Sequence, residues 1–300
     1  MLCRLVCLLL LLTPLSPSAA ADGMPAYLLR IPASIGTVFV AETSTAEFHR
    51  FDNSAGQALR YAGKSYMSIG QKGDGKQRSG DRRTPLGIYI VTEQLDTSRL
   101  HEKYGVTAFV LDYPNAWDRR LERSGDGIWV HGVDRRGGER PPLDTDGCIA
   151  LPNEYLTSLV PTFEPNRTPV IVAREMSWTD ERQLEALRAE LESSIDTWAR
   201  TLERGEIEAH LSLYDDEFRH WGIDRDGWSV VQREAIATRD IQAVELTELL
   251  LLADPEEDDL FLSRFELAIV EASGKTAFTK RLYWRRAANG GLKIIAEDAG

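Results

Sequence analysis

One histidine and one cysteine are the side chains of this sequence best suited to covalent chemistry. His131 ends an apolar segment, and Cys148 follows it after a polar loop. A thiol with a pKa of about 8.5 is mostly protonated at neutral pH, whereas a neighbouring imidazole can accept the proton and produce a thiolate. We therefore expect Cys148 to be a nucleophile and His131 its base. We also expect the thiol to alkylate faster than a model thiol near pH 6.

The residues beside Cys148 suit the stabilisation of an oxyanion. Gly147 allows a tight turn, so that the N–H groups of Asp146, Gly147 and Cys148 can point at one position. The base also needs its second ring nitrogen held. Either the Gly132 carbonyl or the Thr145 hydroxyl can do this.

The first 21 residues predict export. Arg4 precedes an apolar run from Leu5 to Leu12, and Ala19 to Ala21 resemble a signal-peptidase site. The run is shorter than the roughly 20 residues that a membrane-spanning helix needs. We expect residues 1–21 to be a cleaved signal peptide, with an uncleaved anchor as the alternative. The mature protein would be exported and soluble, without a membrane span, and Cys148 would be its single cysteine.

Charge restricts the partners. The chain has 35 basic and 47 acidic residues, a net charge of -12, and the excess of acids lies beyond Glu175. This charge argues against nucleic acid and against anionic membranes.

Two patterns of hydrophobic residues predict two domains. Short apolar runs separated by glycine and proline predict a β-rich domain over residues 22–175, with strands near 37–40, 88–91, 109–111, 128–130 and 170–172. Beyond a boundary near residue 176, Ser177 and Asp180 have capping-box spacing, and leucines three or four residues apart then predict a long helix. The following segments predict a short helix to about Phe218, a helix over 230–238, and strands over 241–252, 260–271, 276–286 and 291–297. Residues 176–300 therefore predict an α+β domain.

The motifs of the first domain resemble those of L,D-transpeptidases of the YkuD type. That family has a histidine, a gap of mid-teens length and then Ser/Thr-His-Gly-Cys; here His131-Gly132 precedes Thr145-Asp146-Gly147-Cys148. The segment Gly80 to Gly87, which contains Thr84-Pro85, resembles the family's Thr-Pro-x-Gly segment. Tyr104-Gly105 and Tyr113-Pro114-Asn115 are similar to a further stretch. The resemblance covers residues from about 27 to 174.

The resemblance implies a peptidoglycan-modifying cysteine acyltransferase of the cell wall, which agrees with export to the periplasm. Its substrate would be the stem peptide, cleaved between meso-diaminopimelate and D-alanine. Cys148 would form a thioester and His131 would act as base and then acid. Transfer to an amine would be transpeptidation, and transfer to water would be carboxypeptidase trimming. The reaction needs no cofactor and no metal.

Two residues depart from the family pattern. Asp146 stands where histidine is common, and Ala150 stands where a polar or basic residue often follows. The sequence is more similar to the branch that includes cell-shape L,D-carboxypeptidases and enzymes that detach wall-anchored lipoprotein. A peptidoglycan–lipoprotein amidase and an inactive wall-binding module are the alternatives.

Several residues are candidates for substrate binding. Arg135, Arg136 and Arg140 lie between base and nucleophile, where guanidinium groups can hold carboxylates, although a solvated loop is equally consistent. The resemblance adds Thr84, Pro85 and Thr145. His49 and His101 have no partner signal in the sequence.

The second domain resembles the cone-shaped nuclear-transport-factor-like and SnoaL-like domains, which have a curved antiparallel sheet. Tyr214, Trp221, Trp228 and Trp284 either line its pocket or fill its core. Domains of this kind often dimerise, so the resemblance also implies a homodimer.

Overall fold

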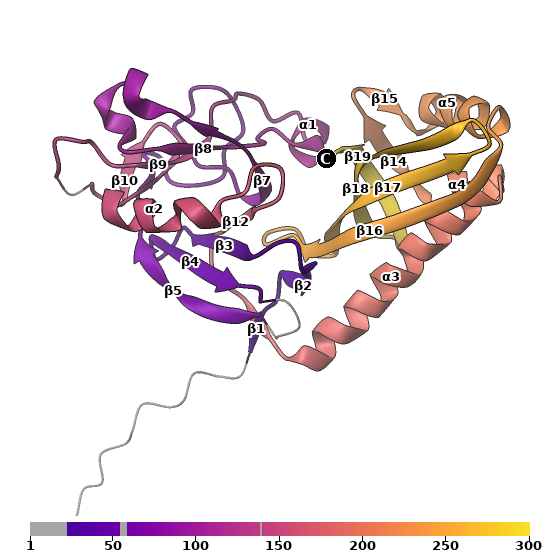
Figure 1. Cartoon of the computed structure of the whole chain (residues 1–300), viewed down its shortest axis with the longest axis horizontal. Helices are drawn as coiled ribbons and strands as arrows, with labels where there is room; N and C mark the ends of the chain where they lie inside the picture. The colour runs from indigo at the N-terminus through magenta and orange to yellow at the C-terminus, as the bar shows by residue number, and fades with distance from the viewer. Residues whose placement is uncertain (1–22, 55–58, 139) are drawn as a thin grey trace, which may run out of the picture.

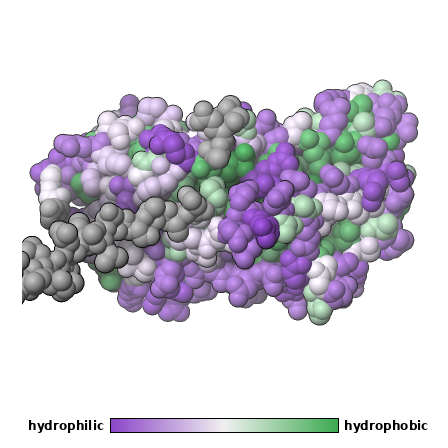
Figure 2. Space-filling model, turned by 90° about the horizontal axis from the view of Figure 1, so that it is seen from below, coloured by the Kyte–Doolittle hydropathy of each residue, from purple (hydrophilic) through white to green (hydrophobic). Residues whose placement is uncertain are grey.

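The computed structural model describes residues 23–54, 59–138 and 140–300, which form two lobes with the C-terminus between them (Figure 1). The predicted signal peptide lies outside the described residues. Within the described ranges, no helix is long and apolar enough to cross a membrane. Seen from below, polar side chains cover most of both lobes (Figure 2).

The first lobe is built on an eight-stranded sheet with the order β11-β9-β8-β7-β12-β3-β4-β5. Its strands are β3 (Thr37–Glu42), β4 (Glu47–Asp52), β5 (Arg60–Tyr66), β7 (Gly87–Leu95), β8 (Ala108–Leu111), β9 (Trp129–Gly132), β11 (Ile149–Leu151) and β12 (Pro169–Ala173). Strands β6 (Ile69–Gly70) and β10 (Leu143–Thr145) form a separate parallel pair. Two short helices, α1 (Ala116–Arg120) and α2 (Asn153–Leu159), and three 3-10 turns, 97–99, 102–104 and 160–162, complete the lobe. The predicted β-rich fold is confirmed.

Strand β12 shows why the strands of this lobe appear in the sequence as continuous apolar runs. Its five residues are all buried, and Val170 and Ile171 belong to different hydrophobic clusters, one on each face of the sheet. A strand buried on both faces loses the alternation of polar and apolar residues. On one face, the ring of Phe163 stacks between Phe39 and Phe109, with ring centroids 4.5 and 4.1 Å apart.

The second lobe packs helices against a seven-stranded sheet with the order β15-β14-β19-β18-β17-β16-β2. Its helices are α3 (Glu181–Glu203), α4 (Ile207–Leu211) and α5 (Arg225–Ala237). Its strands are β14 (Tyr214–His220), β15 (Ile223–Asp224), β16 (Ile241–Ala253), β17 (Leu260–Glu271), β18 (Gly274–Arg286) and β19 (Leu292–Ala299). The four predicted C-terminal strands and the α+β class are confirmed.

Two details of the second lobe differ from the prediction. Asp180, and not Ser177, caps helix α3, with its carboxylate accepting the N–H of Gln183 at 2.9 Å. The predicted helix to Phe218 ends at Leu211, and β14 follows it. Tyr214 and Phe218 are both buried, and a spacing of four residues fits one face of a helix or of a strand. The segment forms a strand because β14 pairs with β19.

The lobes are joined by more than the connecting chain. Strand β2 (Leu28–Arg30) pairs with β16, so the N-terminal segment completes the sheet of the second lobe. Strand β1 (Met24–Pro25) pairs with β13 (Trp178–Thr179) beside the start of α3. One hydrophobic cluster contains residues of both lobes, including Val38, Ile171, Leu250 and Ile295.

The aromatic residues of the second lobe divide between core and surface. Tyr214 and Trp284 are buried, and Trp228 packs against the same core. Trp221 is 69% exposed and lies over the guanidinium of Arg119, 4.1 Å from the ring centroid. Three of the four aromatics therefore contribute to packing.

Candidate active site

His131 and Cys148 line one cavity of about 420 Å³. His131 lies in β9, and Cys148 directly precedes β11, which pairs with β9 in parallel and places Ala150 opposite His131. Adjacent parallel strands therefore bring the predicted base and nucleophile to one end of the sheet. Tyr104, Lys103 and Arg140 line the same cavity.

The imidazole of His131 has a defined tautomer. Its Nδ1 lies 2.6 Å from the carbonyl oxygen of Gly132, which only accepts, so Nδ1 carries the hydrogen. The Gly132 carbonyl is thus the holding group, one of the two alternatives that the sequence left open. The remaining nitrogen, Nε2, carries a lone pair and is suited to accept a proton. Burial lowers the pKa of His131 to about 4, so the ring is neutral at neutral pH.

The thiol of Cys148 is protonated in this arrangement. It donates to the carbonyl oxygen of Gly127, with 3.4 Å between sulfur and oxygen. Burial raises the pKa of the thiol above its usual value, although a hydrogen bond from the Trp129 backbone acts in the opposite direction. A raised thiol pKa disfavours the thiolate on which fast alkylation near pH 6 depends, so the rate of alkylation remains a prediction that labelling of Cys148 tests.

The turn before Cys148 requires glycine. Gly147 has φ of +130°, and a Cβ there would lie 2.7 Å from the carbonyl oxygen of Arg83. The Thr145 hydroxyl donates to the Cys148 carbonyl at 2.7 Å and accepts the Gly147 N–H at 3.1 Å. The Gly147 N–H, one of the three groups expected to stabilise the oxyanion, is therefore already bonded to Thr145. The N–H groups of Asp146 and Cys148 are the other two.

Only one of the three candidate arginines lines the cavity. Arg140 does so, with its Nε 3.2 Å from Asp144. Arg135 instead binds backbone carbonyls of the segment 97–105, including that of Gly105 at 3.0 Å. Arg136 is exposed and pairs with Glu102 and Asp134. The structure thus removes Arg135 and Arg136 from the set that can touch a ligand in this cavity.

Thr84 and Pro85 are buried behind the cavity and do not line it. The Thr84 hydroxyl accepts the N–H of Gly70 at 2.9 Å, and the Thr84 N–H donates to Gly73 at 2.9 Å. These bonds hold the glycine-rich loop 70–84, whose residues Lys76 and Gly80 form part of the cavity wall. Thr84 therefore positions the wall, and neither Thr84 nor Pro85 lines the cavity.

The cavity also contains two lysines, of which sequence reasoning missed Lys103 and placed Lys76 in a basic stretch beside the substrate groove. Lys103 lies 3.5 Å from the exposed carboxylate of Asp146 and 5.0 Å from the ring of Tyr104. Lys76 is buried and pairs with Asp81 at 3.0 Å. The ring of Tyr104 in turn contacts His131 edge-on, with 5.3 Å between centroids. Lys103 directly precedes the Tyr104-Gly105 stretch of the family resemblance, and this position could have identified it as a residue of the site.

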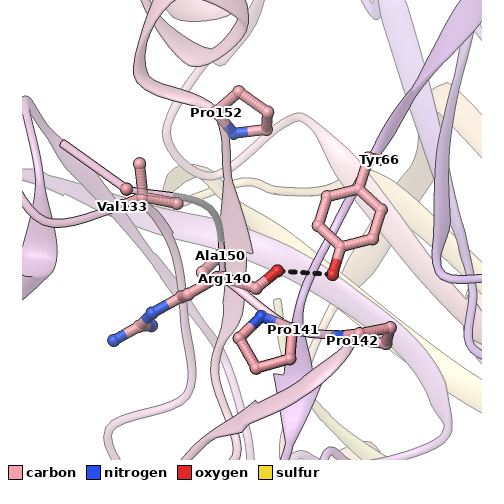
Figure 3. Close-up of a pocket in the computed structure, with 8 residues that line it drawn as sticks. Tyr66, Val133, Arg140, Pro141, Pro142, Ala150 and Pro152 are labelled. Carbon is pink, nitrogen blue, oxygen red and sulfur yellow. Dashed lines mark hydrogen bonds between the residues drawn. The ribbon is translucent and has the colours of Figure 1, made fainter.

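A second cavity of about 810 Å³ adjoins the first at Arg140 (Figure 3). It is lined by Tyr66, Val133, Gly138, Arg140, Pro141, Pro142, Ala150 and Pro152. The Tyr66 hydroxyl donates to the Arg140 carbonyl at 2.6 Å and holds this wall. Ala150, the second departure from the family pattern, leaves room there because its side chain is small.

Comparisons with known proteins agree with this architecture. Residues 38–172 match the L,D-transpeptidase catalytic domain, YkuD, and residues 190–298 match the C-terminal NTF2-like domain of Cds6. The first lobe is thus an L,D-transpeptidase catalytic domain and the second an NTF2-like domain. The chain therefore combines these two domains, in this order.

Two solved structures share the whole two-lobed fold. Bd1075 of Bdellovibrio bacteriovorus has a TM-score of 0.75 at 22% identity, over 93% of this chain and 98% of that one. Pgp2 of Campylobacter jejuni, a helical cell shape determining protein, has a TM-score of 0.74 at 21% identity, over 87% of this chain and 91% of that one. Among curated proteins, none matches this chain.

Proposed function

We propose that the chain is an exported periplasmic enzyme that acts on peptidoglycan stem peptides, at the bond between meso-diaminopimelate and D-alanine. One observation carries the proposal: a neutral imidazole, oriented by the Gly132 carbonyl, and the thiol of Cys148 line the same cavity. The proposal includes a signal peptide over residues 1–21, a catalytic domain over 22–175 and an NTF2-like domain over 176–300.

The first half-reaction transfers the acyl group to sulfur. Nε2 of His131 takes the thiol proton as Sγ of Cys148 attacks the carbonyl carbon, and the N–H groups of Asp146 and Cys148 stabilise the oxyanion. The carbon–nitrogen bond then breaks, and the imidazolium gives its proton to the amine of D-alanine. A thioester remains on Cys148.

The second half-reaction restores the thiol. His131 removes a proton from water or from an acceptor amine, which attacks the thioester, and the thiol recovers the proton as the carbon–sulfur bond breaks. Water yields a trimmed peptide and the amine yields a cross-link. The thiol, imidazole and backbone amides supply every group that these steps require.

The charges of the cavity support a substrate with carboxylates. Lys103 and Arg140 line it together with the nucleophile, and both meso-diaminopimelate and D-alanine carry a free carboxylate. The adjoining cavity, with its proline and tyrosine walls, provides room for the rest of the stem peptide.

The experiment compares purified mature protein with Cys148→Ala on a disaccharide tetrapeptide, with and without an amine acceptor, by mass spectrometry. Release of D-alanine only by the protein with Cys148 supports the proposal. Cross-linked dimers identify transpeptidation, and their absence identifies trimming. A lipoprotein-linked muropeptide tests the amidase alternative. Without any product that depends on Cys148, the chain is a wall-binding module.

A pair of arginine variants tests the assignment of the cavity. Arg140→Ala is expected to lower kcat/KM at least tenfold, because it removes a cation from the cavity wall. Arg136→Ala, which removes an exposed guanidinium outside the cavity, is the matched control and is expected to leave kcat/KM unchanged. Equal effects of the two changes would contradict the placement of the substrate.

A further inference from the structure

A second polar cluster lies in the first lobe, outside the candidate active site. Glu42 ends β3 and Glu47 begins β4, and the two are direct partners across the hairpin. Like charges directly opposite each other destabilise a strand pair. Both carboxylates are largely shielded from solvent, with side chains 13% and 28% exposed. This arrangement calls for a positive charge between them.

His49 points its ring at this pair. The residue is only 6% exposed, and its Nε2 lies 3.4 Å from a Glu42 oxygen and 3.6 Å from a Glu47 oxygen. Within the described residues, neither of these two contacts has the geometry of a well-formed hydrogen bond. The other ring nitrogen, Nδ1, lies 3.3 Å from the Tyr61 hydroxyl. A buried imidazole nitrogen therefore faces two carboxylates at distances longer than a good hydrogen bond.

We propose that Glu42, Glu47 and His49 bind a divalent cation of the zinc class. Three atoms, one from each side chain, lie within 4.8 Å of one another. A tetrahedral ion with bonds of about 2.1 Å separates its ligands by about 3.4 Å, close to the two distances from Nε2. One imidazole and two carboxylates suit zinc better than calcium or magnesium, which prefer oxygen alone.

Neighbouring groups already bind the two carboxylates, and a cation must compete with them. The ammonium of Lys64 lies 2.6 and 2.7 Å from the two oxygens of Glu47, and its side chain is 50% exposed. It is long enough to move into solvent when a cation binds. Glu42 accepts the Thr45 hydroxyl and the Met176 N–H, both at 2.8 Å.

The bond from Met176 gives the site a structural consequence. Met176 lies in the segment between β12 and α3, so an ion at Glu42 would fix the hairpin of the first lobe against the connection to the second. The inference is independent of the proposed function, because none of the three ligands lines the cavity of Cys148.

The test measures zinc binding in the Cys148→Ala background, which removes the thiol as a competing ligand. Mature protein without an affinity tag is titrated with ZnCl₂ against a colorimetric chelator. One saturable site is expected, and the melting temperature should rise with zinc. Glu47→Gln and His49→Ala should each weaken binding at least tenfold, with the fold checked by circular dichroism. Tyr61→Phe should weaken it less, since it removes only the group beside Nδ1.

Two lysine variants separate this site from general attraction to an acidic protein. Lys64→Met removes the competing ammonium and should tighten zinc binding. Lys275→Met breaks a similar pair, with Glu245 at 2.6 Å in the second lobe, and should leave zinc affinity unchanged. Absence of a saturable site would overturn the proposal. Binding that survives both Glu47→Gln and His49→Ala would overturn it as well.

Discussion

In the free protein, His131 is unprotonated and can accept a proton, whereas the thiol of Cys148 still carries its hydrogen. Burial lowers the pKa of the imidazole to about 4 and raises that of the thiol. Both groups are therefore neutral at neutral pH. In the proposed reaction, proton transfer therefore accompanies attack on the substrate, instead of preceding it.

This pairing predicts an unusual acid limit of activity. The base works only when unprotonated, so kcat/KM should fall as pH decreases through the pKa of His131, near 4, and should be nearly constant from about pH 5 to 7. An ordinary imidazole would give the fall near pH 6.5. The measurement is a pH–rate profile of D-alanine release, with Cys148→Ala as the baseline.

Alkylation of the free protein checks the same states independently. Iodoacetamide labelling of Cys148 should increase only at alkaline pH, as expected for a thiol with a raised pKa. A plateau of rapid labelling near pH 6, lost in His131→Ala, would show an ion pair and contradict our description.

Gly147 gives a second prediction at this scale. Gly147→Ala should destabilise the fold by about 1–3 kcal/mol and abolish activity, because the new methyl group meets the Arg83 carbonyl at a left-handed φ. The loss is measured by urea unfolding and by D-alanine release. Gly290→Ala is the control: its φ is +86° but open space surrounds it. It should cost about 1 kcal/mol and leave activity intact.

Helix α3 is the element whose start depends most clearly on one side chain. The Asp180 carboxylate accepts the Gln183 N–H and caps the helix. Asp180→Ala should lower the free energy of unfolding by about 1 kcal/mol in urea denaturation, because a backbone N–H loses its partner. Asp196→Ala, an exposed change within the same helix, should have an effect below about 0.5 kcal/mol. Similar effects would mean that Asp180 does not act as the cap.

At the scale of the whole molecule, Arg281 joins the two lobes. Its buried guanidinium binds both oxygens of Asp298, at 2.7 and 2.8 Å, and also the carboxylate of Asp112 in the first lobe. Arg119 of the first lobe adds a bond of 2.8 Å to the same Asp298. The interface between the lobes thus contains a buried network of ions.

Loss of this guanidinium should be costly. Arg281→Met should lower stability by about 3–5 kcal/mol, since it leaves the buried carboxylate of Asp298 and the half-buried carboxylate of Asp112 without their main partner. Arg285→Met, which breaks a more exposed pair with Asp215 and Glu217, should cost less than about 1 kcal/mol. The measurement is the denaturant midpoint of each variant. Equal denaturant midpoints for Arg281→Met and Arg285→Met would show that the buried network contributes little to stability.

The local sequence was sufficient for features that depend on residue type and short spacing. Cys148, His131 and the glycine turn were recognisable because their chemistry requires those residues. The apolar run of β12 and the regular leucines of α3 predicted elements because burial selects for hydrophobic side chains at fixed intervals.

Tertiary structure alone decided which residues meet. Arg135, Arg136 and Arg140 are equivalent in sequence, and only the course of the loop brings Arg140 to the cavity. Strand β14 differs from a helix through its pairing with β19, and β2 joins a sheet whose other strands lie about 200 residues away. The cluster of Glu42, Glu47 and His49 depends on the register of one hairpin. Such contacts arise from long-range pairing and burial, which no local pattern of residues encodes.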